Sequence, residues 1–296
     1  MVEKTTSTKI ILFCFGIIPR ALRKHFFIAL AMLFYYVSPR QRFITLHNLK
    51  NAFPDRDMAE IIQIAKNTYR HLGIVIAEFF DIPRLTRQDI DNTFEIEGIE
   101  YCRAALEKNK GLLLFGAHFG NWELMAVVIS LIVHPMLLIY RPLDNPILED
   151  LVKWVRATAG SKTLAKERAM RPMLRTLQKN EIVGLLIDQN VAWQEGIFVD
   201  FFGRSACTTD GLAILALHTG APVIPAFMAR QPSGKYRLIL GREVSIVDTG
   251  DYEKDVAANT QIFMKVIEDM IRKYPDQWLW LHHRWKTKKW QALRQR

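Results

Sequence analysis

A histidine and a glutamate five residues apart, His118 and Glu123, follow an apolar run in this chain. The run, residues 111–117, predicts a short buried strand because its apolar residues are continuous. Side chains five residues apart on one helix point about 140° away from each other. The two can therefore meet only if His118 lies in a turn and a helix begins near Asn121, a residue type favoured at helix starts.

A contact between these side chains would make the histidine a general base. The glutamate would hold one ring N–H, fix the tautomer and raise the basicity of the other nitrogen. No nucleophile stands beside the pair in the sequence, so the substrate would have to supply it. With eight histidines and 30 acidic residues among 296, about one such spacing is expected by chance. A buried structural histidine is therefore the alternative interpretation.

From about residue 57 onward, strand-like and helix-like segments alternate along the chain. This alternation predicts an α/β fold in which helices flank a mostly parallel central sheet on both faces. The predicted strands are residues 93–97, 111–117, 136–141, 182–188, 197–202, 222–229 and 236–244. The predicted helices are residues 58–80, 99–109, 121–133, 145–159, 167–179, 208–219 and 253–274.

Polar groups stand where several of these strands end. Arg141 follows one strand, Asp188 and Gln189 close another, and Phe202-Gly203-Arg204 closes a third, where the glycine would allow a close backbone approach. Because parallel strands end at one edge of a sheet, we expect these residues to converge with His118 and bind substrate. Each of them taken alone could equally be a solvated strand end.

The basic charge is concentrated at the two ends of the chain. The formal net charge is +10, and residues 1–56 and residues 271–296 each carry +7, which leaves −4 for the middle. Both ends are also rich in aromatic and aliphatic side chains, which favours an anionic bilayer over nucleic acid as a partner. Residues 278–286 mix indoles with bases, which fits either a membrane interface or a segment packed on the core.

Two apolar runs, residues 10–18 and 26–37, flank a basic segment that contains Arg23. Neither run has the roughly 20 residues that a spanning helix needs. We therefore expect residues 1–45 to form an interfacial membrane anchor with its bases at headgroup level, and residues 46–296 to form the main domain. A single tilted span and a pair of core helices are the alternatives.

Other chemistries lack their sequence signatures. The three cysteines are widely spaced, which suits a reducing compartment and offers no metal site. Residues 203–207 lack the last glycine of a serine-hydrolase elbow. Residues 160–163 lack the order of a phosphate loop, and His282 and His283 are adjacent rather than one helical turn apart. We expect neither a metal nor a cofactor.

With these residues in view, the chain resembles the bacterial lipid A biosynthesis acyltransferases, within the lysophospholipid/glycerophosphate acyltransferase superfamily. The resemblance runs along most of the chain. It rests on Asn48-Leu49, Ala52-Phe53-Pro54, Glu78, residues 116–123, Tyr140-Arg141, Asp188-Gln189, residues 198–204, residues 220–225 and residues 277–286. The Glu-Gly-Thr-Arg block of the glycerophosphate branch is replaced here by Phe-Phe-Gly-Arg, which favours the lipid A-like branch.

The resemblance implies an O-acyltransferase at the cytoplasmic face of the bacterial inner membrane. It would move a fatty acyl chain from an acyl-carrier-protein or CoA thioester, its co-substrate, to a hydroxyl of a lipid A precursor or related lysolipid. His118 would be the base and Glu123 its partner. The substrate-binding blocks would include Arg141, Gly203, Arg204 and Pro225.

Two features of that mechanism stay open in the sequence. Backbone N–H groups near Asn121 and the Arg204 guanidinium are both candidate donors to a tetrahedral oxyanion. The fate of the acyl group is also open, because a thioesterase using water, or a lipid-binding protein without chemistry, would share the fold.

Overall fold

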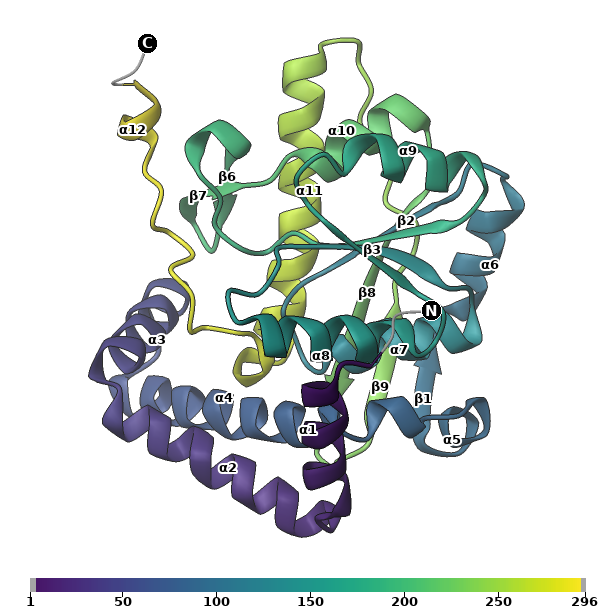
Figure 1. The fold of residues 1–296 in the computed structure, drawn as a ribbon. Coiled ribbons are helices and arrows are strands. Elements are labelled where there is room, and N and C mark those ends of the chain that lie inside the picture. Colours follow the sequence, from purple (N-terminus) through teal and green to yellow (C-terminus); the bar gives the residue numbers. More distant parts are fainter. Residues whose placement is uncertain (1–3, 294–296) are drawn as a thin grey trace.

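In the computed structural model, which describes residues 4–293, five α-helices precede the first strand, and strands and helices mostly alternate from there on (Figure 1). Residues 1–3 and 294–296, at the outer ends of the two predicted domains, lie outside the described part. The strands are β1 (Phe94–Glu97), β2 (Leu112–Gly116), β3 (Met136–Tyr140), β4 (Lys162–Ala165), β5 (Ile182–Leu186), β6 (Ile197–Phe201), β7 (Arg204–Thr208), β8 (Val223–Arg230) and β9 (Tyr236–Leu240). The α-helices are α1 (Thr6–Ile17), α2 (Arg20–Val37), α3 (Pro39–Ala52), α4 (Met58–Phe79), α5 (Arg87–Thr93), α6 (Ile99–Glu107), α7 (Trp122–Ile132), α8 (Pro146–Ala157), α9 (Met170–Gln178), α10 (Gly211–Thr219), α11 (Tyr252–Lys273) and α12 (Lys289–Leu293). Three short 3-10 helices are η1 (Ile82–Arg84), η2 (Trp193–Glu195) and η3 (Pro275–Gln277).

Seven strands form the central sheet in the order β1-β9-β8-β2-β5-β3-β4. β2 lies between β5 and β8 and runs parallel to both, and β3 and β4 continue the parallel set. β9 runs antiparallel to β8, with β1 beside it. The predicted α/β fold with a mostly parallel sheet is confirmed.

The sheet is buried on both faces because helices cover each of them. All five residues of β2 are buried, and alternate side chains point to opposite faces. Leu113 and Phe115 belong to the core shared with α9, α10 and α11. Leu112 and Leu114 belong to the core shared with α6, α7 and α8.

Two of the N-terminal helices, α2 and α3, pack against α4, whereas α1 contacts α8, and α2 and α4 lie side by side in Figure 1. One face of α2 is buried there, formed by Arg23, Phe27, Ala31 and Tyr35. Among residues 4–293, none of the helices combines the length and the apolar character needed to cross a bilayer.

Arg23 departs from the prediction that the bases of this segment lie at headgroup level. Its side chain is only 2% exposed and forms an ion pair with Asp81. Its Nε donates to the carbonyl of Ala77 at 3.0 Å and its Nη1 to the carbonyl of Phe15 at 2.9 Å. A buried guanidinium needs such partners, and here they join α1 and α2 to the end of α4.

Candidate active site

His118 lies in the turn between β2 and α7, as predicted from its position after the apolar run. The helix begins where expected, since the Asn121 side chain caps it by accepting a hydrogen bond from the Leu124 N–H at 3.1 Å. The histidine therefore sits at the carboxyl end of the central strand, the edge where open α/β sheets place their ligands.

The turn is fixed by the strands and by the C-terminal segment beside it. Gly120 has φ of +57°, and a Cβ atom there would lie 1.7 Å from the carbonyl oxygen of Met228, so glycine is required. The Gly120 N–H donates to the carbonyl of Gln277 at 2.8 Å, and the Leu279 N–H donates to the carbonyl of His118 at 3.0 Å. The main chain around the imidazole is thus held from two sides.

The carboxylate that binds the imidazole is Asp188, at the end of β5. Its Oδ1 lies 2.8 Å from His118 Nδ1, while its Oδ2 accepts hydrogen bonds from the His118 backbone N–H at 3.0 Å and from Trp278 Nε1 at 2.7 Å. Asp188 is fully buried, whereas the imidazole is 23% exposed. An acceptor at Nδ1 places the proton there and leaves Nε2 as the basic nitrogen.

The Asp188 carboxyl remains ionised despite its burial. Burial alone would raise its pKa, but the charge of His118 and the hydrogen bonds from that ring and from Trp278 outweigh it, so the pKa lies below its ordinary value. An ionised carboxylate against Nδ1 stabilises the imidazolium that forms when Nε2 takes a proton. Asp188 was predicted as a substrate-binding residue; its complete burial and its three donors instead make it the partner of His118.

Glu123 does not make the predicted hydrogen bond to the ring. Its two oxygens accept a forked pair of bonds from Arg156 on α8, at 2.8 Å from Nε and 2.6 Å from Nη2, and one of them also accepts from Trp122 Nε1 at 3.1 Å. α7 directs this carboxylate toward α8, while β5 brings Asp188 to His118.

Glu123 is nevertheless coupled to the imidazole electrostatically. Burial would raise the pKa of the Glu123 carboxyl, but Arg156 and then His118 lower it, and the net direction is down. Glu123 and Arg156 thus form an ion pair beside the imidazole that is largely shielded from solvent, with side chains 12% and 15% exposed.

Gln189 joins this site and Arg141 lies at its margin. The Gln189 side-chain nitrogen is 3.5 Å from His118 Nε2, and the side chain is exposed. Arg141 follows β3 at the same edge of the sheet, where its exposed guanidinium pairs with Asp144 at 3.1 Å. The convergence of strand ends is therefore confirmed for β2 and β5.

The third predicted strand end lies elsewhere. β6 pairs only with β7 among the described strands, in a separate two-stranded hairpin, whose turn is Phe202 and Gly203, both with positive φ. Phe202 packs against Phe53 and Trp280. A Cβ at Gly203 would meet nothing within 4 Å, so no backbone approaches this glycine closely, and Arg204 is exposed.

Pro225 lies inside the sheet rather than at the site. It is a buried residue of β8 that stands opposite Phe115 of β2. Its carbonyl accepts from the Gly241 N–H at 2.9 Å. The residue shapes the central sheet beneath the turn and is not placed to touch a substrate.

The turn itself offers few free backbone donors. The N–H groups of His118, Phe119, Gly120 and Asn121 donate to Asp188, Ala117, Gln277 and Met228, respectively. These four N–H groups are therefore not free to bind an oxyanion, and the exposed amide of Gln189 is a donor beside the imidazole.

A buried polar network on α4 supports the same turn. Glu78 accepts hydrogen bonds from Asn121 Nδ2 at 2.9 Å and from the Tyr236 hydroxyl at 2.7 Å. Burial raises the pKa of Glu78, and these two bonds oppose the rise. The buried ring of His71 lies beside the Gly120 backbone. The network ties the start of α7 to α4 and β9.

Two supporting residues were not predicted as residues of the site. Trp278 lies in the stretch that mixes indoles and bases, and its complete burial confirms the interpretation of that stretch as packed on the core. Arg156 is one basic residue on an ordinary amphipathic helix, and nothing in the local sequence distinguishes it.

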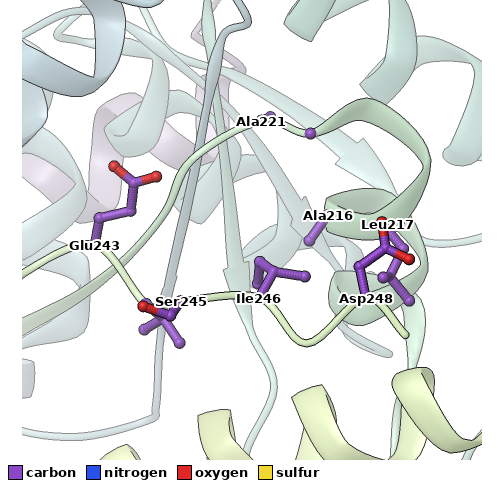
Figure 2. Close-up of a pocket in the computed structure, with 9 residues that line it drawn as sticks. Ala216, Leu217, Ala221, Glu243, Ser245, Ile246 and Asp248 are labelled. Atoms are coloured by element: carbon purple, nitrogen blue, oxygen red, sulfur yellow. The ribbon is translucent and has the colours of Figure 1, made fainter. Parts of the chain in front are cut away.

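A hollow of about 370 Å³ lies at the opposite edge of the sheet (Figure 2). Ala221, just before β8, and Glu243 and Asp248, after β9, are among its lining residues. His118 lies at the other ends of these strands, so this hollow is separate from the candidate site. Within residues 4–293, no group of three or more His, Cys, Asp or Glu side chains could hold a metal ion.

Comparison with known proteins identifies the class of protein that carries this fold and site. The family model described as bacterial lipid A biosynthesis acyltransferase matches residues 6–287. The chain belongs to this family and is an acyltransferase.

Three relatives show the range of the similarity. The lipid A biosynthesis lauroyltransferase of Escherichia coli (strain K12) is 30% identical over 257 residues, covering 84% of this chain and 80% of the relative. A lipid A biosynthesis acyltransferase of Haemophilus influenzae is 30% identical over 255 residues, or 85% and 79% of the two chains. A phosphatidylinositol mannoside acyltransferase of Mycolicibacterium smegmatis is 24% identical over 212 residues, or 70% and 67%.

Proposed function

We propose that this acyltransferase moves a fatty acyl chain from a thioester, carried by acyl carrier protein or CoA, to a hydroxyl of a lipid A precursor or related lysolipid. The observation that supports it most is the partly exposed imidazole of His118, whose Nδ1 is held by the buried Asp188 carboxylate. The relatives, which are named as lipid A and phosphatidylinositol mannoside acyltransferases, support the choice of a lipid acceptor.

The proton path follows from the orientation of the ring. The acceptor hydroxyl binds at His118 Nε2, which takes its proton as the oxygen attacks the thioester carbonyl. The C–S bond then breaks, and the imidazolium returns the proton to the leaving thiolate. Asp188 holds Nδ1–H throughout, so the ring keeps one orientation and one tautomer. Positioned base catalysis of this kind contributes about 10²–10⁴ in rate.

In this proposal, two groups beside His118 support the reaction. The Gln189 amide, 3.5 Å from Nε2, is a candidate donor to the oxygen of the tetrahedral intermediate. The forked Glu123–Arg156 pair keeps α7 and α8 in fixed relation beside the imidazole, since a bidentate pair constrains both distance and orientation. Its net charge is near zero, so it leaves the imidazole free to become cationic.

A bilayer surface is the proposed location, and the exposed faces of α1 and α2 support it. The exposed apolar residues include Ile10, Phe13 and Ile17 on α1, and Leu22, Phe26, Leu30, Leu33 and Val37 on α2, where Phe34 and Tyr36 are exposed as well. Their spacing of three or four residues places them on one stripe of each helix, and on α2 this stripe lies about 120° around the helix from the face that packs on α4. Such a stripe fits an interfacial helix, here at the cytoplasmic face of the inner membrane.

The enzymatic proposal is tested with purified protein, an acyl thioester and a lipid that carries a free hydroxyl. We expect His118→Ala to lower kcat by about 10²–10⁴, while His134→Ala, at an exposed histidine after α7, leaves it unchanged. Equal turnover by wild type and His118→Ala would refute the base assignment. Free fatty acid without acylated lipid would identify a thioesterase instead.

The membrane proposal has its own test. The wild-type protein should co-sediment with vesicles that contain anionic phospholipid, whereas the double variant Phe26→Gln/Leu30→Gln should remain in the supernatant. The matched control is Met170→Gln/Tyr252→Gln, which removes exposed apolar side chains from α9 and α11. Equal sedimentation of both double variants would contradict a docking role for α2.

A further inference from the structure

A second hollow lies beside the C-terminal segment, and its lining includes Asn190, two residues along the chain from Asp188. It has a volume of about 280 Å³ and is lined by Asn190, Ala192, Trp193, Lys286, Thr287 and Gln291. In Figure 1 the C-terminal segment runs past the β6–β7 hairpin to α12, and the bond from Arg284 Nη1 to the carbonyl of Cys207 at 2.8 Å fixes it there.

The segment Asp188–Asn190 connects this hollow directly to the imidazole. Asp188 holds His118, and Gln189 presents its amide to the ring. Asn190 is bonded to Thr287 twice, from Nδ2 to Oγ1 at 3.0 Å and from the Thr287 N–H to Oδ1 at 3.1 Å. Consecutive Cα atoms are 3.8 Å apart, so the wall of the hollow begins at most about 7.6 Å from the Cα of Asp188.

The electrostatics of the hollow favour an anion. Lys286 is exposed at its lining, and Lys288 and Lys289 follow it. Residues 277–296 contain no acidic residue, and the acid of η2, Glu195, is neutralised by Lys166 at 2.6 Å. The lysines therefore lack a carboxylate partner on these two segments, while the Trp193 indole offers a flat apolar surface.

We infer that this hollow binds the phosphate end of the thioester donor, the 4′-phosphopantetheine arm that acyl carrier protein and coenzyme A share. The inference rests on the proposed function, because an arm held here delivers its thioester along residues 188–190 to His118. Lys286 supplies the phosphate contact as a point charge. No covalent step takes place in the hollow.

Direct binding tests the site without requiring turnover. The probes are coenzyme A, holo acyl carrier protein and pantetheine, which lacks the phosphate, each titrated calorimetrically into the full chain. We expect Lys286→Glu to weaken binding of coenzyme A, of the carrier protein or of both by about tenfold, and to leave pantetheine unaffected. The probe that responds identifies the natural source of the phosphate.

The matched control is Lys179→Glu, which reverses an exposed charge at the end of α9 and should leave all three affinities unchanged. Lys286→Gln, a milder change, should weaken phosphate-bearing probes by a smaller factor. Unchanged affinity of Lys286→Glu for both phosphorylated probes, or an equal loss for pantetheine, would overturn the inference. In turnover assays Lys286→Glu should raise KM for the donor and leave kcat within about twofold of the wild-type value. If the proposed function itself is wrong, the wild-type protein will show no acyl transfer, so the two failures are distinguishable.

Discussion

Replacing Asp188 by Asn tests the assignment of this buried carboxylate as the partner of His118. The carboxylate receives three donors: the ring Nδ1–H and backbone N–H of His118, and the Trp278 indole. The amide of asparagine has one oxygen, and at the Oδ2 position that oxygen can accept from both the His118 backbone N–H and the Trp278 indole. Its NH2 group then faces Nδ1, which must become an acceptor, so the proton moves to Nε2 and the base is lost.

The expected magnitude follows from that change of tautomer. Loss of the base removes its 10²–10⁴ in rate, and the same replacement in serine proteases lowers kcat by about 10⁴. Acyl transfer is measured by mass spectrometry of the acylated lipid at saturating donor and acceptor. Thermal unfolding of the variant, followed by circular dichroism, verifies that it is folded.

A double-mutant cycle separates this effect from general damage. If Asp188 acts only through the imidazole, then adding Asp188→Asn to His118→Ala lowers kcat no further. A folded Asp188→Asn variant with kcat within threefold of wild type would refute the assignment. Additive losses in the cycle would refute it as well.

Two further predictions concern stability. Gly120→Ala should lower the free energy of unfolding by about 2–5 kcal/mol, because the new Cβ meets the Met228 carbonyl and φ is +57°. Gly203→Ala, where φ is +70° and the space is open, should lower it by only about 1–2 kcal/mol. Equal urea midpoints for the two variants would contradict this difference. Burial lowers the pKa of His71 and of His282 to about 4 from 6.5, so the unfolded chain binds more protons below pH 6.5 and stability must fall as pH drops from 6.5 to 4. The loss should reach about 3 kcal/mol per ring; urea unfolding at several pH values checks it, and a slope unchanged by His71→Gln would count against it.

The sequence predicted the sheet because its parallel strands are continuous apolar runs bounded by turn residues. It missed elements that lack such runs. β4 is four residues long and begins with Lys162, and β7 reads Arg-Ser-Ala-Cys-Thr, which has no apolar alternation. Placing β6 in the main sheet followed from its apolar pattern, which does not distinguish a sheet strand from a packed hairpin.

The site was predicted in part, for a physical reason. The position of His118 depends on local features, an apolar strand and an Asn cap, and these are readable in sequence. Its partner depends on which strand lies beside β2, and strand order is set by tertiary packing. The sequence pattern favours Glu123, which is near His118 along the chain, whereas Asp188, 70 residues away, is near His118 in space.

The contacts between the turn and residues 277–279 bear on how the enzyme is synthesised. A nascent chain grows at about 5–20 residues per second and folds from its N-terminus, so all seven strands of the sheet leave the ribosome before Trp278 does. Until then the Asp188 carboxylate lacks its indole donor, and the main chain around the imidazole lacks two of its hydrogen bonds. A translation product that stops short of residue 277 would carry every strand of the sheet but would lack these three hydrogen bonds to Asp188 and to the turn.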